Sequence, residues 1–324
     1  GDNNVAVGLN ALDVNTTGAE NTALGANALD ANTTGEKNVA IGKDALTTDT
    51  LGSRSIAIGH SSLKNQNFTS ATNSNNVAVG FFAGEDITTA VCNTIIGSQA
   101  GEKITTGSNN VAVGFDSLSS NTTGACNTAI GVQALDASTT ANQNTAIGML
   151  SMTATTSGIR NVAVGRQSMC ANTTGCCNVA MGSNALASGT TGDFNVAVGG
   201  AALGSVNTGN CNTAIGACAM NTNTSGANNT AVGKDALTAN TTADNNTGVG
   251  SFALCKNTEG FSNTAVGHCA IFTNTTGDKN TGVGVGALLA NTTANDNTAV
   301  GYLSLAANTT GATNSAFGNY ALYS

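Results

Sequence analysis

Apolar and polar positions along this chain follow one repeating pattern, which begins at Asn4, Asn21 and Asn38 and returns at the same interval thereafter. Each copy opens with Asn, followed by Thr or Val, usually Ala, then Val or Ile, and then Gly. Nineteen copies begin between Asn4 and Asn314, and all the intervals but one are equal in length. A period held over nearly the whole chain is the signature of a repeat architecture. We number positions within the repeat from this Asn.

Positions 1 to 5 predict a short strand, because small and β-branched residues alternate there. Positions 2 and 4 then face one side of the strand, and position 3 faces the other. Gly8 and Gly25, at position 5, would end the strand where a turn needs positive φ or backbones approach closely. The Asn-Thr-Thr-Gly segment at positions 12 to 15, as in residues 15–18, predicts a second turn. Positions 6 to 11 could form a second short strand or one helical turn, and the absence of a helical stripe favours the strand.

A 17-residue unit cannot bury its own apolar face, so the copies are predicted to stack about 4.8 Å apart. The predicted fold class is all-β, a parallel β-solenoid (β-roll) of about nineteen 17-residue coils. Like residues would form columns: Val or Ile at position 4 and Leu at position 9, each contributing about 1.5–3 kcal/mol where fully buried. Asn at position 1 would bond amide to amide between coils. The residues that first define these columns are Asn4, Asn21, Asn38, Val7, Ile41, Leu12 and Leu29.

Departures from the repeat predict local adjustments within one continuous solenoid over residues 1–324. The interval between Ser55 and Asn76 is longer than the others, which predicts an insertion loop near residues 64–75. Two copies have Gly in place of Leu at position 9 and carry Ile87 or Ile104 at position 12, so we expect that Ile to fill the space of the Leu. Ala recurs at position 3 in sixteen copies, which indicates either the inside of a thin coil or a contact between chains. Both ends fall inside a repeat, which favours an excerpt of a longer fibre.

Composition supports an uninterrupted sheet and argues against several partners. The chain has no Pro, as a continuous ladder requires, and it carries ten Lys and Arg with a net charge of −8. Nucleic acid is therefore not an expected partner, because phosphate binding needs clustered positive charge. No long apolar run predicts direct membrane insertion. The two histidines, His60 and His268, lie twelve copies apart, so they form no catalytic pair within a chain, and we expect neither enzyme activity nor a cofactor.

The nine Cys leave two main interpretations open: small buried or free thiols, or some disulfides. Cys170 could close a turn with Cys176 or Cys177, and Cys255 could reach Cys269 on the next coil. A metal site is less favoured, since no second ligand pair lies at the usual spacing.

The Asn-Thr-Thr segments also match the acceptor pattern for N-glycosylation, although turn chemistry alone explains them and is the favoured interpretation. The candidate acceptors are Asn15, Asn32, Asn121, Asn172, Asn240, Asn274, Asn291 and Asn308.

Two repeat families resemble this pattern. Residues 39–45 and 111–117 are similar to the Val-Ala-Ile-Gly-x-x-Ser/Ala core of trimeric autotransporter adhesin heads, and residues 297–311 resemble the longer repeat of phage and virus tail-fibre-like shafts. The resemblance covers essentially the whole chain. It implies a parallel β-roll, commonly a homotrimer, on a cell or virion surface. The 17-residue unit is longer than that of the adhesin heads, so their handedness and trimer packing do not carry over.

These observations favour a structural or adhesive surface fibre segment, a shaft or receptor-contacting spacer, in the extracellular space. Its partners would be copies of itself and a host-surface receptor or glycan. One alternative is a self-assembling extracellular filament with chains stacked end to end. A less favoured alternative is an ice-binding solenoid, because Val replaces Thr at position 2 in seven copies and Ile in one.

Overall fold

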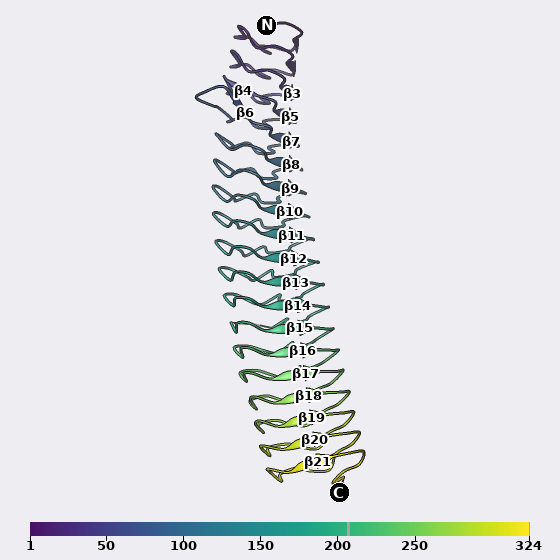
Figure 1. The fold of residues 1–324 in the computed structure, drawn as a ribbon. Helices are drawn as coiled ribbons and strands as arrows, with labels where there is room; N and C mark the ends of the chain where they lie inside the picture. The colour runs from purple at the N-terminus through teal and green to yellow at the C-terminus, as the bar shows by residue number, and fades with distance from the viewer. Residues whose placement is uncertain (206–207, 324) are drawn as a thin grey trace. The chain divides into compact units, whose positions relative to one another are not determined.

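The computed structural model describes residues 1–205 and 208–323 (Figure 1). The described residues contain strands and turns and no helix, and the strands stack in parallel, which confirms the predicted β-solenoid with one repeat in each coil. The chain divides into two compact units, Gly1–Arg160 and Asn161–Ser324, and each unit is itself a stack of coils. One continuous solenoid over the full length stays a prediction.

Each repeat contributes one three-residue strand made of positions 2 to 4. In the first unit these are β1 (Val5–Val7), β2 (Thr22–Leu24), β3 (Val39–Ile41), β5 (Ile56–Ile58), β7 (Val77–Val79), β8 (Thr94–Ile96), β9 (Val111–Val113), β10 (Thr128–Ile130) and β11 (Thr145–Ile147). Two further short strands, β4 (Gly52–Ser53) and β6 (Thr72–Asn73), pair with each other. The second unit contains β12 (Val162–Val164), β13 (Val179–Met181), β14 (Val196–Val198), β15 (Thr213–Ile215), β16 (Thr230–Val232), β17 (Thr247–Val249), β18 (Thr264–Val266), β19 (Thr281–Val283), β20 (Thr298–Val300) and β21 (Ser315–Phe317).

Neighbouring strands within each unit pair position for position, so identical repeat positions lie directly over one another. Val7 pairs with Leu24, and Leu24 pairs with Ile41. In the second unit Thr213 pairs with Thr230 in the same way. Columns of like residues therefore follow from the fixed length of the repeat, because extra residues would shift the register unless they loop out, as they do between Ser55 and Asn76.

Glycine at position 5 ends each strand because the backbone there turns and approaches the next coil closely. Gly8 has φ 136°, and a Cβ on it would lie 2.5 Å from the Gly25 carbonyl oxygen. An L-residue rarely adopts this conformation, and no side chain fits in the space. The strict Gly of the repeat is thus explained by conformation and by contact together.

The segment after the glycine is a series of turns, so the second strand predicted for positions 6 to 11 is wrong. Residues at positions 7 and 9 are left-handed, as in Asn27 (φ 56°) and Leu29 (φ 52°). A left-handed Leu costs roughly 1–2 kcal/mol. Its side chain is fully buried in return, and Leu29 has no exposed surface. The left-handed pair curls the chain tightly enough to direct Leu inward.

Small residues line the inside of the coil. Ala23, at position 3, and Ala28, at position 8, are fully buried together with Leu29. Position 3 is therefore the inside of a thin coil, which decides between the two interpretations of its recurrent Ala. Such a narrow interior leaves little room for large side chains, and in most coils Leu at position 9 is the large apolar residue that fills it.

The two copies with Gly at position 9 keep the interior filled from other positions, as expected. Ile87 and Ile104 are fully buried, and so is Ile95, which replaces the usual Ala at position 3. A Cβ on Gly101 would lie 2.9 Å from Ile104 Cδ1, so the isoleucine side chain occupies the place of the missing Leu. The volume of the interior is conserved although the residues that supply it have moved.

The extra residues of the long interval form the projection beside β4 and β6 in Figure 1. Phe68 is buried, whereas Thr69 to Ala71 are exposed. The chain is back in register at Ser74, whose carbonyl accepts a hydrogen bond from the Cys92 backbone N–H at 2.8 Å. The insertion expected near residues 64–75 is therefore confined to a short stretch at one turn.

Candidate functional site: the exposed strand face

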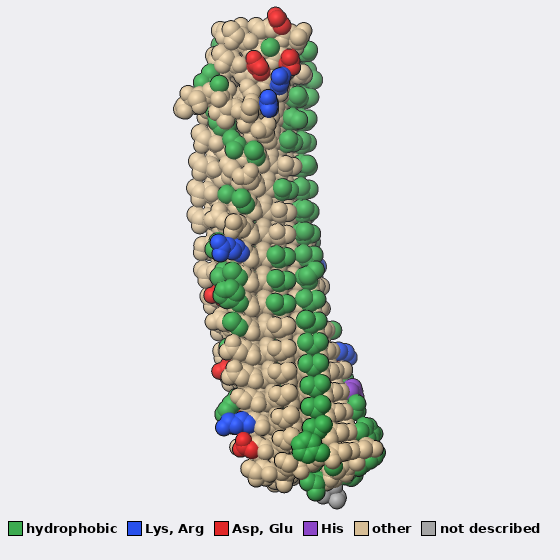
Figure 2. Space-filling view, viewed as in Figure 1, with side chains coloured by type: hydrophobic (Ala, Val, Ile, Leu, Met, Phe, Trp, Pro, Cys, Tyr) green, Lys and Arg blue, Asp and Glu red, His purple; other side chains and the backbone are tan. Residues whose placement is uncertain are grey.

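Positions 2 and 4 point out of the coil and form what we call the strand face. Our expectation that the position 4 column is buried is wrong: Val7 is 57% exposed and Leu24 is 46% exposed. Figure 2 shows a line of green side chains along this face, beside a second column that contains both green and tan side chains. The strand face thus places β-branched residues in two parallel rows in contact with solvent.

The residue at position 2 varies along this face: β2, β8, β10 and β11 of the first unit carry Thr there, whereas β12, β13 and β14 of the second unit are apolar at both outward positions. In the first unit, β3, β5, β7 and β9 have apolar residues at both outward positions, as in Val39 and Ile41 or Ile56 and Ile58. In the second unit, six consecutive strands, β15 to β20, carry Thr at position 2 and Val or Ile at position 4. Neither outward position carries a charged residue in any copy.

Asn at position 1 stabilises the stack from inside, through backbone bonds in addition to the side-chain bonds expected. Asn21 Nδ2 donates to the Gly35 carbonyl oxygen at 2.9 Å, and the backbone N–H of Asn38 donates to Asn21 Oδ1 at 2.9 Å. Each side chain therefore links its own coil to the next one through the backbone. Asn21 and Asn38 are buried and Asn4 is partly exposed, so most of these bonds are protected from water.

The amide-to-amide bonds expected at position 1 are present there, as from Asn280 Nδ2 to Asn263 Oδ1 at 3.1 Å, and a second ladder of the same kind runs along position 12. Asn274 Nδ2 donates to Asn257 Oδ1 at 2.8 Å, and Asn291 Nδ2 donates to Asn274 Oδ1 at 3.0 Å. The same Nδ2 atoms also bond within their own turn, as Asn274 does to the Gly277 carbonyl oxygen at 2.8 Å. This ladder is the hydrogen-bonded pattern of stacked Asn side chains.

These positions are also the candidate glycosylation sites, and the fold hides most of them. Asn32, Asn121, Asn172, Asn240, Asn274 and Asn291 are 2% exposed or less. Asn15 and Asn308 are partly exposed. A glycan is attached through Nδ2, the atom that the six buried residues keep inside the coil, so the folded stack argues against modification at these six and supports the turn interpretation.

One member of the position 12 column is an acid, and it interrupts the ladder. Asp49 accepts hydrogen bonds from Gln66 Nε2 at 2.6 Å and from the Gly52 backbone N–H at 2.9 Å. Burial raises the pKa of the Asp49 carboxyl despite these bonds. A carboxylate has no N–H to donate to the Asn of the preceding coil. Asn32 Oδ1 is therefore buried without a hydrogen-bond partner.

All nine cysteines are free thiols in the structure. Cys170 Sγ donates to the Ala187 carbonyl oxygen at 3.2 Å, and partial burial raises the pKa of this thiol. Burial raises the pKa of Cys255 and of Cys269 as well. Desolvation, together with the adjacent Asp193 carboxylate and Cys177, raises the pKa of Cys176 to about 11. High pKa values keep thiols protonated and slow to react at neutral pH.

The two histidines contact different kinds of side chain: His60 packs on aromatic rings, whereas His268 Nε2 lies 3.6 Å from Cys269 Sγ, a Cys–His contact that was not expected from the sequence. His60 lies against Phe81 and Phe82, with ring centroids 5.4 and 5.5 Å away. No three His, Cys, Asp or Glu residues gather as metal ligands in 1–205 and 208–323. No helix long and apolar enough to cross a membrane occurs in that part of the chain.

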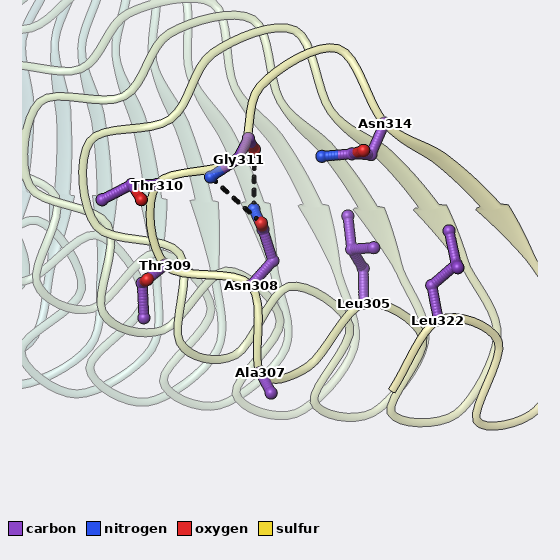
Figure 3. A pocket seen from close by; sticks show the side chains of 8 residues that line it. All are labelled: Leu305, Ala307, Asn308, Thr309, Thr310, Gly311, Asn314 and Leu322. Carbon is purple, nitrogen blue, oxygen red and sulfur yellow. Dashed lines mark hydrogen bonds between the residues drawn. The ribbon is translucent and has the colours of Figure 1, made fainter. Parts of the chain in front are cut away.

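A pocket of about 350 Å³ opens at the last coil (Figure 3). Asn308 and Gly311 bond to each other there, through Nδ2 to the carbonyl oxygen at 2.8 Å and through the backbone N–H to Oδ1 at 3.1 Å. The lining consists of repeat positions that inner coils cover with the following coil. These are Leu305, Ala307, Asn308, Thr309, Thr310, Gly311, Asn314 and Leu322. The pocket is therefore the open side of a coil, built from ladder residues.

Comparison with known proteins adds no relative: no protein-family model matches the chain, and no curated protein matches it in sequence. The fold and the columns define it as a parallel β-solenoid repeat protein. Its distinguishing surface is the strand face, which sequence reasoning placed inside.

Proposed function

We propose that this chain is a structural segment of a surface fibre, in which copies of the chain associate through the strand face of the first unit. The observation that carries the proposal is the unbroken row of partly exposed Val, Leu and Ile side chains at position 4 from β2 to β11, flanked by apolar position 2 residues on the consecutive strands β3, β5 and β7. Parallel sheets are normally covered on both faces. Contiguous exposed apolar surface is typical of protein–protein contacts.

The way the coils are joined also suits a structural part. Backbone pairing and buried Asn side chains link each coil to the next within a unit, as between Asn21 and Asn38. Such a stack gains stability from every added repeat, because nearest-neighbour contacts supply most of it. The resemblance to adhesin heads favours a homotrimer, an extracellular position on a cell or virion, and a host-surface receptor or glycan as further partner.

Sedimentation equilibrium of the full chain tests the assembly. The expected mass is about three times the 31.7 kDa of one chain. Ile130→Lys places a charge on the strand face, where Ile130 is 37% exposed, and should produce monomers because an interface does not readily bury an unpaired charge. Val132→Lys is the matched control, since Val132 is 44% exposed on the same coil but outside the strand face.

A wild-type chain that sediments as a monomer at all concentrations would contradict the proposal. A mass that grows without limit as the concentration rises would identify the open filament instead, because head-to-tail contacts that do not close form polymers. Equal dissociation of Ile130→Lys and Val132→Lys would place the interface elsewhere.

A further inference from the structure

We propose that the strand face of β15 to β20, in the second unit, binds ice. This inference goes beyond the structural function and concerns a different set of strands. The threonines at position 2 are Thr213, Thr230, Thr247, Thr264, Thr281 and Thr298, and their neighbours at position 4 are Ile215, Val232, Val249, Val266, Val283 and Val300.

Regular spacing is the first requirement that this array meets. The strands pair residue for residue from Thr213 to Thr298. The hydroxyl groups therefore form a single row, with one threonine on each successive coil. Parallel strands lie about 4.8 Å apart, and alternate residues on one strand are about 6.6 Å apart. The surface lattice of hexagonal ice repeats at similar distances in two directions. Water molecules held on the two rows would thus be placed close to positions that ice requires.

Free hydroxyl groups are the second requirement, and here two threonine columns of the same coils differ. Thr258 Oγ1 at position 13 donates to the Thr275 carbonyl oxygen at 3.0 Å, and Thr275 Oγ1 donates to the Thr292 carbonyl oxygen at 3.1 Å. The position 2 hydroxyls, such as that of Thr264, have no hydrogen-bond partner within the described residues. They are partly exposed and point outward, so their hydrogen-bonding capacity is directed to water.

Rigidity is the third requirement. Thr, Val and Ile are all β-branched and have few side-chain conformations, so little entropy is lost when an ordered water layer forms over them. The rows contain no charged side chain that would hold water in a competing arrangement. Methyl groups and hydroxyls side by side can order a layer of water. They do not hold water in the tight shell that surrounds a charged group.

Ice recrystallisation inhibition and the shape of single ice crystals in a nanolitre osmometer test the proposal on the full chain. The wild type is expected to facet ice crystals and to suppress their coarsening. Thr264→Tyr places a bulky ring in the middle of the row and should lose most of this activity. Thr276→Tyr is the matched control, because Thr276 is exposed on the same coil at position 14, outside the strand face.

Circular dichroism and thermal unfolding should show that both variants fold like the wild type. An inactive wild type, or equal activity of Thr264→Tyr and Thr276→Tyr, would overturn the proposal. Ile130→Lys lies in the first unit and should keep its ice activity while losing assembly, so the two proposals fail separately.

Discussion

Ile271 and Gly282 share one space inside the coil stack: a Cβ on Gly282 would lie 2.7 Å from Ile271 Cγ1. Position 9 is Leu in most copies and position 3 is Ala, whereas here a β-branched Ile is matched by Gly. The smaller residue compensates for the branch.

Gly282→Ala should therefore destabilise the fold by about 1–3 kcal/mol, the usual cost of overpacking. Adding Ile271→Leu should recover most of that loss, because it recreates the Leu254 and Ala265 pair of the preceding coil. Gly248→Ala is the control: its Cβ would meet its nearest neighbours at 3.3 Å or more, so a change within about 0.5 kcal/mol is expected. Urea unfolding measures all three, and the absence of recovery in the double variant would show that Ile271 is not the obstacle.

The position 1 Asn column should be sensitive to loss of a single amide. Asn263→Ala leaves the buried Asn280 backbone N–H without its acceptor Asn263 Oδ1, now 2.9 Å away. The Gly277 carbonyl keeps a bond from Asn274 Nδ2, so one group is orphaned, at a cost of about 1–3 kcal/mol. Asn295→Ala removes a similar bond to the Asp278 N–H at an exposed turn, where water replaces it. Equal unfolding free energies for the two variants would refute the role assigned to burial.

Asp49 should make stability depend on pH. Its folded-state pKa is raised above the ordinary value of 3.8 by burial, so the folded chain holds the proton more tightly than the unfolded chain. The resulting stability is fully present below the unfolded pKa and is lost as pH rises through the folded pKa. Asp49→Asn should abolish this dependence and supply a donor for Asn32 Oδ1, a bond contributing about 1 kcal/mol.

The measurement is thermal unfolding of wild type and Asp49→Asn between about pH 3 and 8. This interval spans the usual pKa values of carboxyl groups, roughly 3–5, and extends above them. Asp13→Asn, at an exposed position, is the control. A wild-type curve that rises with pH over the range in which Asp49→Asn stays flat would reverse the predicted sign.

Thiol labelling should separate the cysteines into two groups. Exposed Cys92, Cys126 and Cys211 should react with iodoacetamide at neutral pH before Cys170 and Cys255, whose raised pKa keeps them protonated. Peptide mass spectrometry over a time course reads each site. Mapping without reduction would at the same time reveal any Cys170–Cys176 or Cys255–Cys269 disulfide, and either bridge would contradict the free thiols of the structure.

Most of the fold could be predicted from the period of the repeat. Register, the strand at positions 2 to 4, the turning glycine and the place of the insertion all follow from spacing and residue type. Which side of the strand faces the coil interior did not follow, because Val-Ala-Val is apolar on both sides. Only the width of the coil decides that Ala23 faces inward and Leu24 outward, and that width depends on turns that the sequence did not reveal.

Those turns were missed for a physical reason. Leu29 and its equivalents adopt a left-handed conformation that Leu rarely takes in isolation. Packing across coils overrides the local preference. The ladder residues of position 12 were likewise assigned to turn chemistry correctly, but their burial depends on the neighbouring coil, as Asn274 and Asn257 show.

Because the bonds described above join residues within one coil or in neighbouring coils, the chain closes only short loops as it folds. Low sequence separation of contacts favours rapid folding, and within a unit the coils can add one after another onto a formed edge. Pulled from one end, such a unit should release the length of one repeat at each step, so that mechanical tension is dissipated in many small, equal events rather than in one rupture.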